Sequence, residues 1–347
     1  MAKKTRFILL SMFMFVAMVL FAGCHLREPL PVPGQEVACR KINIAPGPED
    51  FVLDTWHGAP RLLVSSHDRR KPKTSGGIFY LNLETEATGE MKRVGEPAAI
   101  TAFKPHGMDI RQSGEEVLLY VILHDPAGRM KSHENAIGVY LVADSELQFQ
   151  DLLEDASFLW SPNDLSVMPG GEIYVTNDRR NDLDIYFKRE SSEIVYYQPE
   201  TKTWSIVADN LVFANGIYAE KDRVFVTETL GEGFLMFPRL PDGRLGPKEI
   251  IARMKGGDNI MKYGDYFLTT AHYDDLAFLK HKKNPENHSP SIVFRVRPEV
   301  YGKEAMYVNT GDMISAASTA MVFNNKIYIS QVFDPFIVVC DVPVYVY

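Results

Sequence analysis

Carboxylate and amide side chains gather in short polar corners that recur along the chain. Hard oxygen donors of this kind suit calcium, which takes six to eight of them with relaxed geometry, whereas magnesium seldom receives such an all-protein cage. Zinc would need imidazole or thiolate ligands, and the sequence has no H-x-x-x-H or C-x-x-C spacing. The corner residues are Glu49, Asp50, His106, Asn163, Asp164, Asn215, Asp258 and Asn259, and all but His106 offer oxygen. If the corners converge in space, they predict a calcium site.

The simpler interpretation of each corner is a turn. Asn-Asp and Asp-Asn pairs commonly bond their own backbone and need no metal to do so. However, three Asx-containing corners occupy matching places in a repeat, and each precedes an apolar strand. The matching positions favour metal binding, provided that the fold brings the corners together.

The strands that must position these corners also repeat. Six copies of a corner followed by an apolar strand lie about 45 to 60 residues apart, within the range of repeat architectures. Each is followed by a β-branched and aromatic second strand and by a weaker third one. The first strands are RLLVSSHD (61–68), VLLYVILHD (117–125), EIYVTND (172–178), RVFVTET (223–229), YFLTTAHY (266–273) and KIYISQVF (326–333).

This pattern predicts an all-β protein, and a six-bladed β-propeller rather than a sandwich, because radial repetition explains the even spacing. The inner strands would surround a central calcium-binding tunnel and bring the corners to one face. A strand at 37–44 would complete the last blade beside residues 337–341. No sustained helical periodicity follows the first two dozen residues, so 177–192 and 280–290 are expected to be long, solvated loops.

The overall composition is that of an ordinary globular protein, with 46% hydrophobic and 24% charged residues. The net charge of -8 and the pI of about 5.6 argue against nucleic acid as a partner. An acidic chain is compatible with cation binding but does not establish it.

The N-terminus has the pattern of an export signal. A positive segment with Lys3, Lys4 and Arg6 precedes the apolar run 7–23, and Cys24 follows in a sequence that resembles a bacterial lipobox. We therefore expect a lipoprotein-type signal peptide at 1–23, lipidation of Cys24, a proline-rich tether at 24–36 and the propeller domain at 37–347. The protein would then be exported and lipid-anchored to a membrane of the cell envelope. Ordinary signal cleavage and an uncleaved anchor are the alternatives.

The two other cysteines, Cys39 and Cys340, lie at the two ends of the expected propeller. Export implies an oxidising compartment, where such a pair can form a disulfide. A closed ring of blades would bring the chain ends together, but two free buried thiols are the alternative.

Several phrases closely resemble the serum paraoxonase and arylesterase family. The resemblance extends from about Cys39 to Cys340, and the phrases are specific in combination although each is weak alone. They are PHGMDI (105–110), SPNDLSV (161–167), FANGIY (213–218), VFVTETL (224–230), DNI (258–260) and LTTAHY (268–273). Members of that family are six-bladed propellers with two calcium ions in the central tunnel and a disulfide between the terminal segments.

The resemblance implies a role for each corner residue. For a catalytic calcium ion at the tunnel mouth it implies the ligands Glu49, Asn163, Asn215, Asp258 and Asn259. For a buried structural calcium ion it implies Asp50, Asp164 and the main-chain carbonyl of Met108. It also implies a histidine dyad of His106 and His124, a pocket lined by Asp178, Phe213 and His272, and the disulfide Cys39–Cys340.

This chain departs from the family pattern at three places. The interval from His106 to His124 is about one residue shorter, Ala271 replaces a free cysteine beside the pocket histidine, and the lipobox replaces a retained hydrophobic helix. These departures bear on substrate preference and membrane docking and leave the calcium ligands intact.

The expected chemistry is hydrolysis of a lactone or aryl ester. A calcium ion with an open position can polarise the carbonyl and stabilise the oxyanion, while neutral His106 activates water and His124 orients it or relays the proton. A serine nucleophile is not expected, because the sequence has no G-x-S-x-G elbow. The alternatives are a sugar-lactonase or phosphotriesterase that uses the same cage without a histidine dyad, and a calcium-stabilised propeller that binds ligands without turnover.

Overall fold

The computed structural model describes residues 29–31, 37–128 and 134–343. The chain divides into two compact units, Met1–Val32 and Pro33–Tyr347, and all the described strands belong to the second. The expected signal peptide, the lipidation site Cys24 and most of the tether lie outside the described residues. Within the described part of the chain, no helix is long and apolar enough to cross a membrane.

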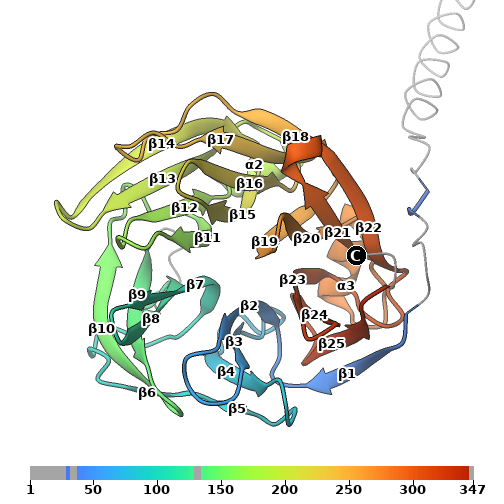
Figure 1. The fold of residues 1–347 in the computed structure, drawn as a ribbon, viewed down its shortest axis with the longest axis horizontal. Coiled ribbons are helices and arrows are strands. Elements are labelled where there is room, and N and C mark those ends of the chain that lie inside the picture. The colour runs from blue at the N-terminus through green and yellow to red at the C-terminus, as the bar shows by residue number, and fades with distance from the viewer. Residues whose placement is uncertain (1–28, 32–36, 129–133, 344–347) are drawn as a thin grey trace, which may run out of the picture. The chain divides into compact units, whose positions relative to one another are not determined.

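Six β-sheets stand around a common axis and form the blades of a propeller (Figure 1). The fold class predicted from the repeats is therefore confirmed. The first blade consists of β2 (Pro48–Asp54), β3 (Arg61–Ser66), β4 (Gly77–Asn82) and β5 (Thr88–Glu90). The second blade consists of β7 (Pro105–Ser113), β8 (Glu116–His124), β9 (Asn135–Val142), β10 (Glu146–Glu154) and β6 (Lys92–Val94). The third blade consists of β11 (Pro162–Val167), β12 (Ile173–Asn177), β13 (Ser192–Gln198) and β14 (Thr203–Leu211). The fourth blade consists of β15 (Ala214–Ala219), β16 (Arg223–Glu228), β17 (Gly233–Pro238) and β18 (Glu249–Arg253). The fifth blade consists of β19 (Gly257–Tyr263), β20 (Tyr266–His272), β21 (Ser291–Arg297) and β22 (Gly302–Asn309). The sixth blade consists of β23 (Ala317–Phe323), β24 (Lys326–Gln331), β25 (Phe336–Asp341) and the N-terminal strand β1 (Cys39–Asn43).

The strand that follows each corner is the second strand of its blade, and it is largely buried on both faces because each blade packs against a neighbour on either side. All residues of β3 and β12 are buried, so these strands lack the alternation of a half-exposed sheet. Large side chains such as Phe51, Tyr140 and Phe225 are fully buried between the blades. Burial of this apolar surface is the main favourable contribution to the ring.

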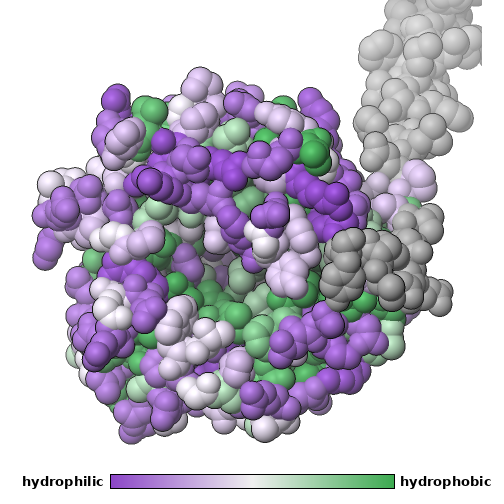
Figure 2. Space-filling model, viewed as in Figure 1, coloured by the Kyte–Doolittle hydropathy of each residue, from purple (hydrophilic) through white to green (hydrophobic). Residues whose placement is uncertain are grey.

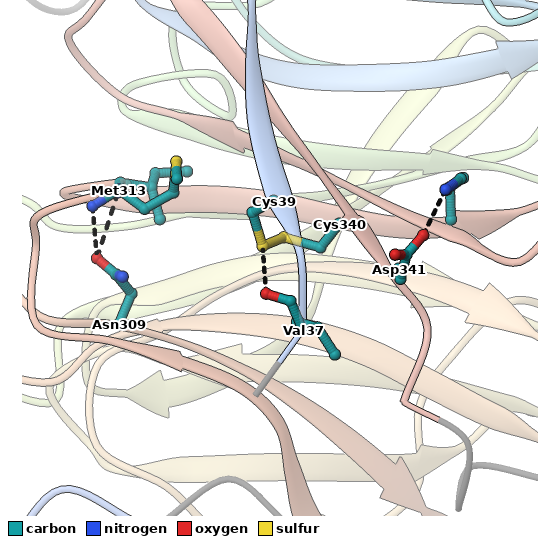
Figure 3. Close-up of a disulfide and its surroundings, with 8 residues drawn as sticks. Val37, Cys39, Asn309, Met313, Cys340 and Asp341 are labelled. Atoms are coloured by element: carbon teal, nitrogen blue, oxygen red, sulfur yellow. Dashed lines mark hydrogen bonds and ion pairs between the residues drawn. A yellow bond between two sulfur atoms is a disulfide. The ribbon is translucent and has the colours of Figure 1, made fainter. Parts of the chain in front are cut away.

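The ring is closed by the N-terminal strand, as the sequence predicted. Strand β1 pairs antiparallel with β25, and this register sets Cys39 opposite Cys340. The two cysteines form a disulfide across 301 residues of sequence (Figure 3). The alternative of two free thiols is thereby excluded.

Four of the described elements differ from the expectation. Strand β6 joins β10 in parallel, which gives the second blade a fifth strand. Two short helices, α2 (Asp182–Phe187) and α3 (Asp275–Lys283), occupy parts of the segments expected to be loops or lie next to them. A single 3-10 turn, η1 (Pro298–Val300), follows β21.

Candidate functional site

Every polar corner coincides with a β-bulge in the innermost strand of its blade. The pairing register shifts between Pro48 and Asp50 in β2, and at the matching place in the five other inner strands β7, β11, β15, β19 and β23. A bulge removes residues from the ladder and re-aims their side chains. The repeated bulges thus explain how six separate corners present polar groups toward one axis. Figure 2 shows that the molecule is hollowed at the middle of the ring on the face seen there.

Four corner residues carry a buried oxygen atom without any hydrogen-bond partner. These atoms are Glu49 Oε2, Asn163 Oδ1, Asn215 Oδ1 and Asn259 Oδ1, which come from four different blades. The residues themselves are only 3%, 7%, 5% and 2% exposed. An unsatisfied buried polar atom is rare and costs about 1–3 kcal/mol. The four oxygen atoms, on the inner strands of four blades, are donors that a cation could use.

The asparagine amide nitrogens hold these oxygen atoms in place. Asn215 Nδ2 donates to Thr229 Oγ1 at 3.0 Å, and Asn259 Nδ2 donates to Thr319 Oγ1 at 2.9 Å and to Glu49 Oε1 at 3.2 Å. These hydrogen bonds fix the orientation of each amide group. The amide oxygen on the other side accepts no hydrogen bond and is available to a ligand. The arrangement is the one expected for amides that bind a cation through oxygen.

Asp50 and Asp164 form a second acidic group. Their carboxylates accept hydrogen bonds from the next blade, Asp50 from the amide of Met108 at 2.8 Å and Asp164 from the amide of Ile217 at 2.9 Å. Burial raises the pKa of both carboxyls well above the ordinary value, and repulsion from Glu49 raises that of Asp50 further. Asp50 in turn raises the pKa of Asp164. A bound cation would remove this repulsion.

The donor set fits calcium better than the ions that prefer nitrogen or sulfur. Among the described residues, no group of three or more His, Cys, Asp and Glu side chains has a metal-binding arrangement. Three of the four unpartnered oxygen atoms belong to asparagine, a residue type outside those four. Carboxylate and amide oxygens together are the ligands that calcium takes.

The two predicted dyad histidines stack on each other beside this set. Their ring centroids are 4.7 Å apart with an interplanar angle of 29°. His124 Nε2 lies 2.7 Å from the carbonyl oxygen of Pro162, so a neutral ring donates its proton there. His106 Nδ1 lies 2.9 Å from Arg69 Nη2 and must accept, because a guanidinium has no acceptor.

Both histidines are held neutral by their surroundings. Burial lowers the pKa of His124 to about 4, with the positive charge of Arg69 contributing. Burial likewise lowers the pKa of His106 well below its ordinary value, and the charge of Arg69 is the next cause. A neutral imidazole is the form that can take a proton from water.

The predicted pocket residues lie next to the same groups. Asp178 pairs with Arg179 at 2.5 Å and lies 3.5 Å from Asn163 Nδ2. The ring of Phe213, whose φ of 54° is left-handed, lies 6.0 Å from the Arg179 guanidinium carbon. His272 Nε2 lies 2.8 Å from an Asp258 carboxylate oxygen.

Arg69 is the main site residue that the sequence pattern alone did not reveal. It lies in a charged run after β3, and such runs are usually solvated. His67, two residues before Arg69, occupies the repeat position that His124 and Asp178 occupy after the matching strands, because each of the three amides bonds the carbonyl just before its corner. The nearness of Arg69 to this repeat position was the available signal. The sequence did not predict the site residues of the sixth corner either: Ser318 donates a hydrogen bond to the carboxylate of Glu49, and Thr319 donates one to that of Asp50.

Known proteins resemble this chain in sequence over nearly its whole length. Serum paraoxonase/arylesterase 2 from Bos taurus is 24% identical over 326 residues, which is 90% of this chain and 86% of that protein. Serum paraoxonase/arylesterase 1 from Mus musculus is 23% identical over 338 residues, which is 93% of this chain and 90% of that protein.

Solved structures share the fold. A gluconolactonase from Xanthomonas campestris superposes with a TM-score of 0.58 at 14% identity, covering 88% of this chain and 90% of that one. Regucalcin from Agrobacterium tumefaciens, a calcium-binding protein, superposes with a TM-score of 0.56 at 10% identity, covering 88% and 94%. At these identities the likeness is one of fold.

The family model named Arylesterase matches residues 34–342. This range holds all six blades, both histidines and every corner residue. The chain therefore belongs to the arylesterase family.

Proposed function

We propose that this protein is a calcium-dependent hydrolase of lactones or aryl esters. The observation that carries the proposal is the set of four buried, unpartnered oxygen atoms that come from four blades. Membership of the arylesterase family supports the reaction class. We propose Glu49, Asn163, Asn215, Asp258 and Asn259 as ligands of one calcium ion, and Asp50, Asp164 and the carbonyl of Met108 as ligands of a second.

When bound at the tunnel mouth, calcium would supply a Lewis acid for the substrate carbonyl. His106 would take the proton of the attacking water while the water oxygen bonds to the acyl carbon. The proton would then pass to the leaving oxygen as the ester bond breaks. His124, held by the carbonyl of Pro162, would fix the orientation of the His106 ring through stacking. Asp178, Phe213 and His272 would line the pocket.

A panel of lactones and phenyl acetate tests this reaction class. We expect hydrolysis that is lost when EDTA removes calcium and recovered when calcium is restored. Hydrolysis that persists in EDTA would contradict a calcium-dependent reaction. Retained calcium with no turnover on any substrate would instead favour a calcium-stabilised binding propeller.

A metal-only hydrolase, such as a sugar-lactonase or phosphotriesterase, is the second candidate. The observation that favours it is the hydrogen bond from Arg69 to His106 Nδ1, which occupies the basic nitrogen of that ring. Unchanged turnover in His106→Gln with calcium retained would support this candidate. Loss of turnover with calcium retained would support the dyad.

We also propose that the protein is exported and anchored through lipid on Cys24, with a tether before the propeller. The basis is the N-terminal sequence pattern alone. Mass spectrometry of the envelope-extracted protein would detect a lipid-modified N-terminal cysteine. An unmodified Cys24 would overturn the anchor.

A further inference from the structure

Arg69 is the one cation beside the site that has no carboxylate hydrogen-bonded to it among the described residues. Its three charged neighbours each have such a partner: Arg70 pairs with Asp334 at 2.6 Å, Lys104 with Asp125 at 2.9 Å, and Arg179 with Asp178 at 2.5 Å. The carboxylate paired with Arg69 is that of Glu49, whose Oε2 is 3.5 Å away and accepts no hydrogen bond, while Asp258 and Asp50 act on Arg69 through their charge alone. Its positive charge is therefore incompletely matched.

The guanidinium of Arg69 is nevertheless held in a fixed place. Nη1 donates to the carbonyl oxygens of Gly47 at 3.1 Å and His67 at 3.3 Å. Nη2 points to His106 Nδ1. These hydrogen bonds fix the orientation of the side chain, and its exposed fraction of 14% leaves it accessible to solvent.

Calcium binding would balance the three carboxylates whose negative charge now acts on Arg69, namely Glu49, Asp50 and Asp258. The corners contribute the four carboxylates Glu49, Asp50, Asp164 and Asp258, whose charge two divalent ions would balance. Glu49 would then be neutralised by metal, and Arg69 would remain as a partly buried cation beside the catalytic histidine. Such a charge is costly unless an anion pairs with it.

We propose that Arg69 recognises a carboxylate on the substrate, so that the enzyme prefers esters or lactones that carry an anionic group. A guanidinium and a carboxylate form strong, charge-assisted hydrogen bonds with a defined geometry. A carboxylate at this position would also draw the Arg69 hydrogen bond away from His106 Nδ1 and free that nitrogen to act as a base. The inference rests on the proposed hydrolase function, since it assigns the substrate class of the same site.

The test compares two esters that differ in charge and share the same bond to be broken. These are 4-acetoxybenzoate, which is anionic, and methyl 4-acetoxybenzoate, which is neutral. We expect the purified full-length protein in calcium to have a higher kcat/KM for the anionic ester. In Arg69→Gln the ratio of the two kcat/KM values should fall by at least about tenfold, because a hydrogen bond to a charged group contributes that much or more.

A matched variant controls for the loss of a positive charge in the same loop. Lys71 pairs with Asp68 at 3.3 Å, and its side chain is 74% exposed. Lys71→Gln should leave the ratio of the two kcat/KM values unchanged. A neutral ester that is hydrolysed as well as the anionic one, or an equal loss of both in Arg69→Gln, would overturn the proposal.

Binding measured without turnover separates this inference from the proposed function. Calorimetry with 4-acetamidobenzoate and its methyl ester, in which an amide replaces the reactive ester, does not depend on hydrolysis. Binding that favours the carboxylate and is lost in Arg69→Gln supports the inference even if no ester is hydrolysed. Equal binding of both compounds, or no binding of either, overturns it.

Discussion

Replacing Asp164 by asparagine should change the stability of the protein in opposite directions with and without calcium. In the folded, metal-free chain, burial and the neighbouring Asp50 raise the pKa of Asp164 well above its ordinary value. The folded state therefore keeps a proton that the unfolded chain has released. The stability of the metal-free wild type must fall as the pH rises from the ordinary aspartate pKa toward the raised one. Asp164→Asn lacks this group and should gain stability relative to the wild type as the pH rises.

The size of the effect comes from proton linkage. One linked proton changes the free energy of unfolding by about 1.4 kcal/mol per pH unit. The variant also loses a good acceptor for the amides of Leu165 and Ile217, which Asp164 now bonds at 2.8 and 2.9 Å. That loss of about 1–3 kcal/mol is a constant offset and does not change the slope with pH. In calcium the wild type should be the more stable protein, by about 4 kcal/mol if the ion is present at a thousand times its dissociation constant.

Urea unfolding at pH 5, 6, 7 and 8, in EDTA and in calcium, measures both effects. The exposed hairpin residue Asp265 offers a matched control, since Asp265→Asn removes a solvated carboxylate. The control should show no dependence on pH or calcium relative to the wild type. A flat or falling difference between Asp164→Asn and the wild type in EDTA would refute the buried-charge argument. An equal response of both proteins to calcium would refute the assignment of Asp164 as a ligand.

Three other perturbations test the site and the ring closure. His106→Gln should lower hydrolysis by about 10²–10⁴-fold while calcium still raises the unfolding midpoint, and loss of both responses would point to a structural role instead. Replacing Cys39 and Cys340 by alanine should lower the free energy of unfolding by at most about 6 kcal/mol, and a reducing agent should shift the wild type but not the variant in urea. Gly216→Ala would place a methyl group 2.5 Å from the carbonyl oxygen of Asp258, so it should weaken the calcium response in thermal unfolding. An unchanged calcium response in that variant would show that the Asp258 corner tolerates displacement.

The sequence contained enough information for the blades and their closure. Each blade repeats a corner and an apolar strand, and because β3 is buried on both faces, its hydrophobic residues Leu62, Leu63 and Val64 follow one another without alternation. The placement of Cys39 and Cys340 at the ends of this repeat made their pairing a natural consequence of a closed ring. Repetition made these features predictable because the same local signal occurs six times.

The missed elements depend on contacts that no local pattern records. Helix α2 begins with a capping box formed by Asn181 and Asp184. The helix has only six residues, which is too few for a helical period to appear in the sequence. Strand β6 pairs with β10 through residues more than fifty positions away. Arg69 looks like a solvated charge until the fold brings it beside Glu49 and His106.

The central claim is that the corner oxygen atoms form the calcium site. Calorimetry on Asn215→Leu tests it most directly, by measuring the affinity for calcium and the number of ions bound after bound metal has been removed. Asn215 Oδ1 is buried and unpartnered, and leucine removes it with little change in side-chain size. We predict that the variant loses one of the calcium ions bound by the wild type, together with hydrolysis of phenyl acetate, and keeps the ion held by Asp50 and Asp164. An unchanged number of ions bound with unchanged affinity would contradict the conclusion that the corner oxygens form the calcium site.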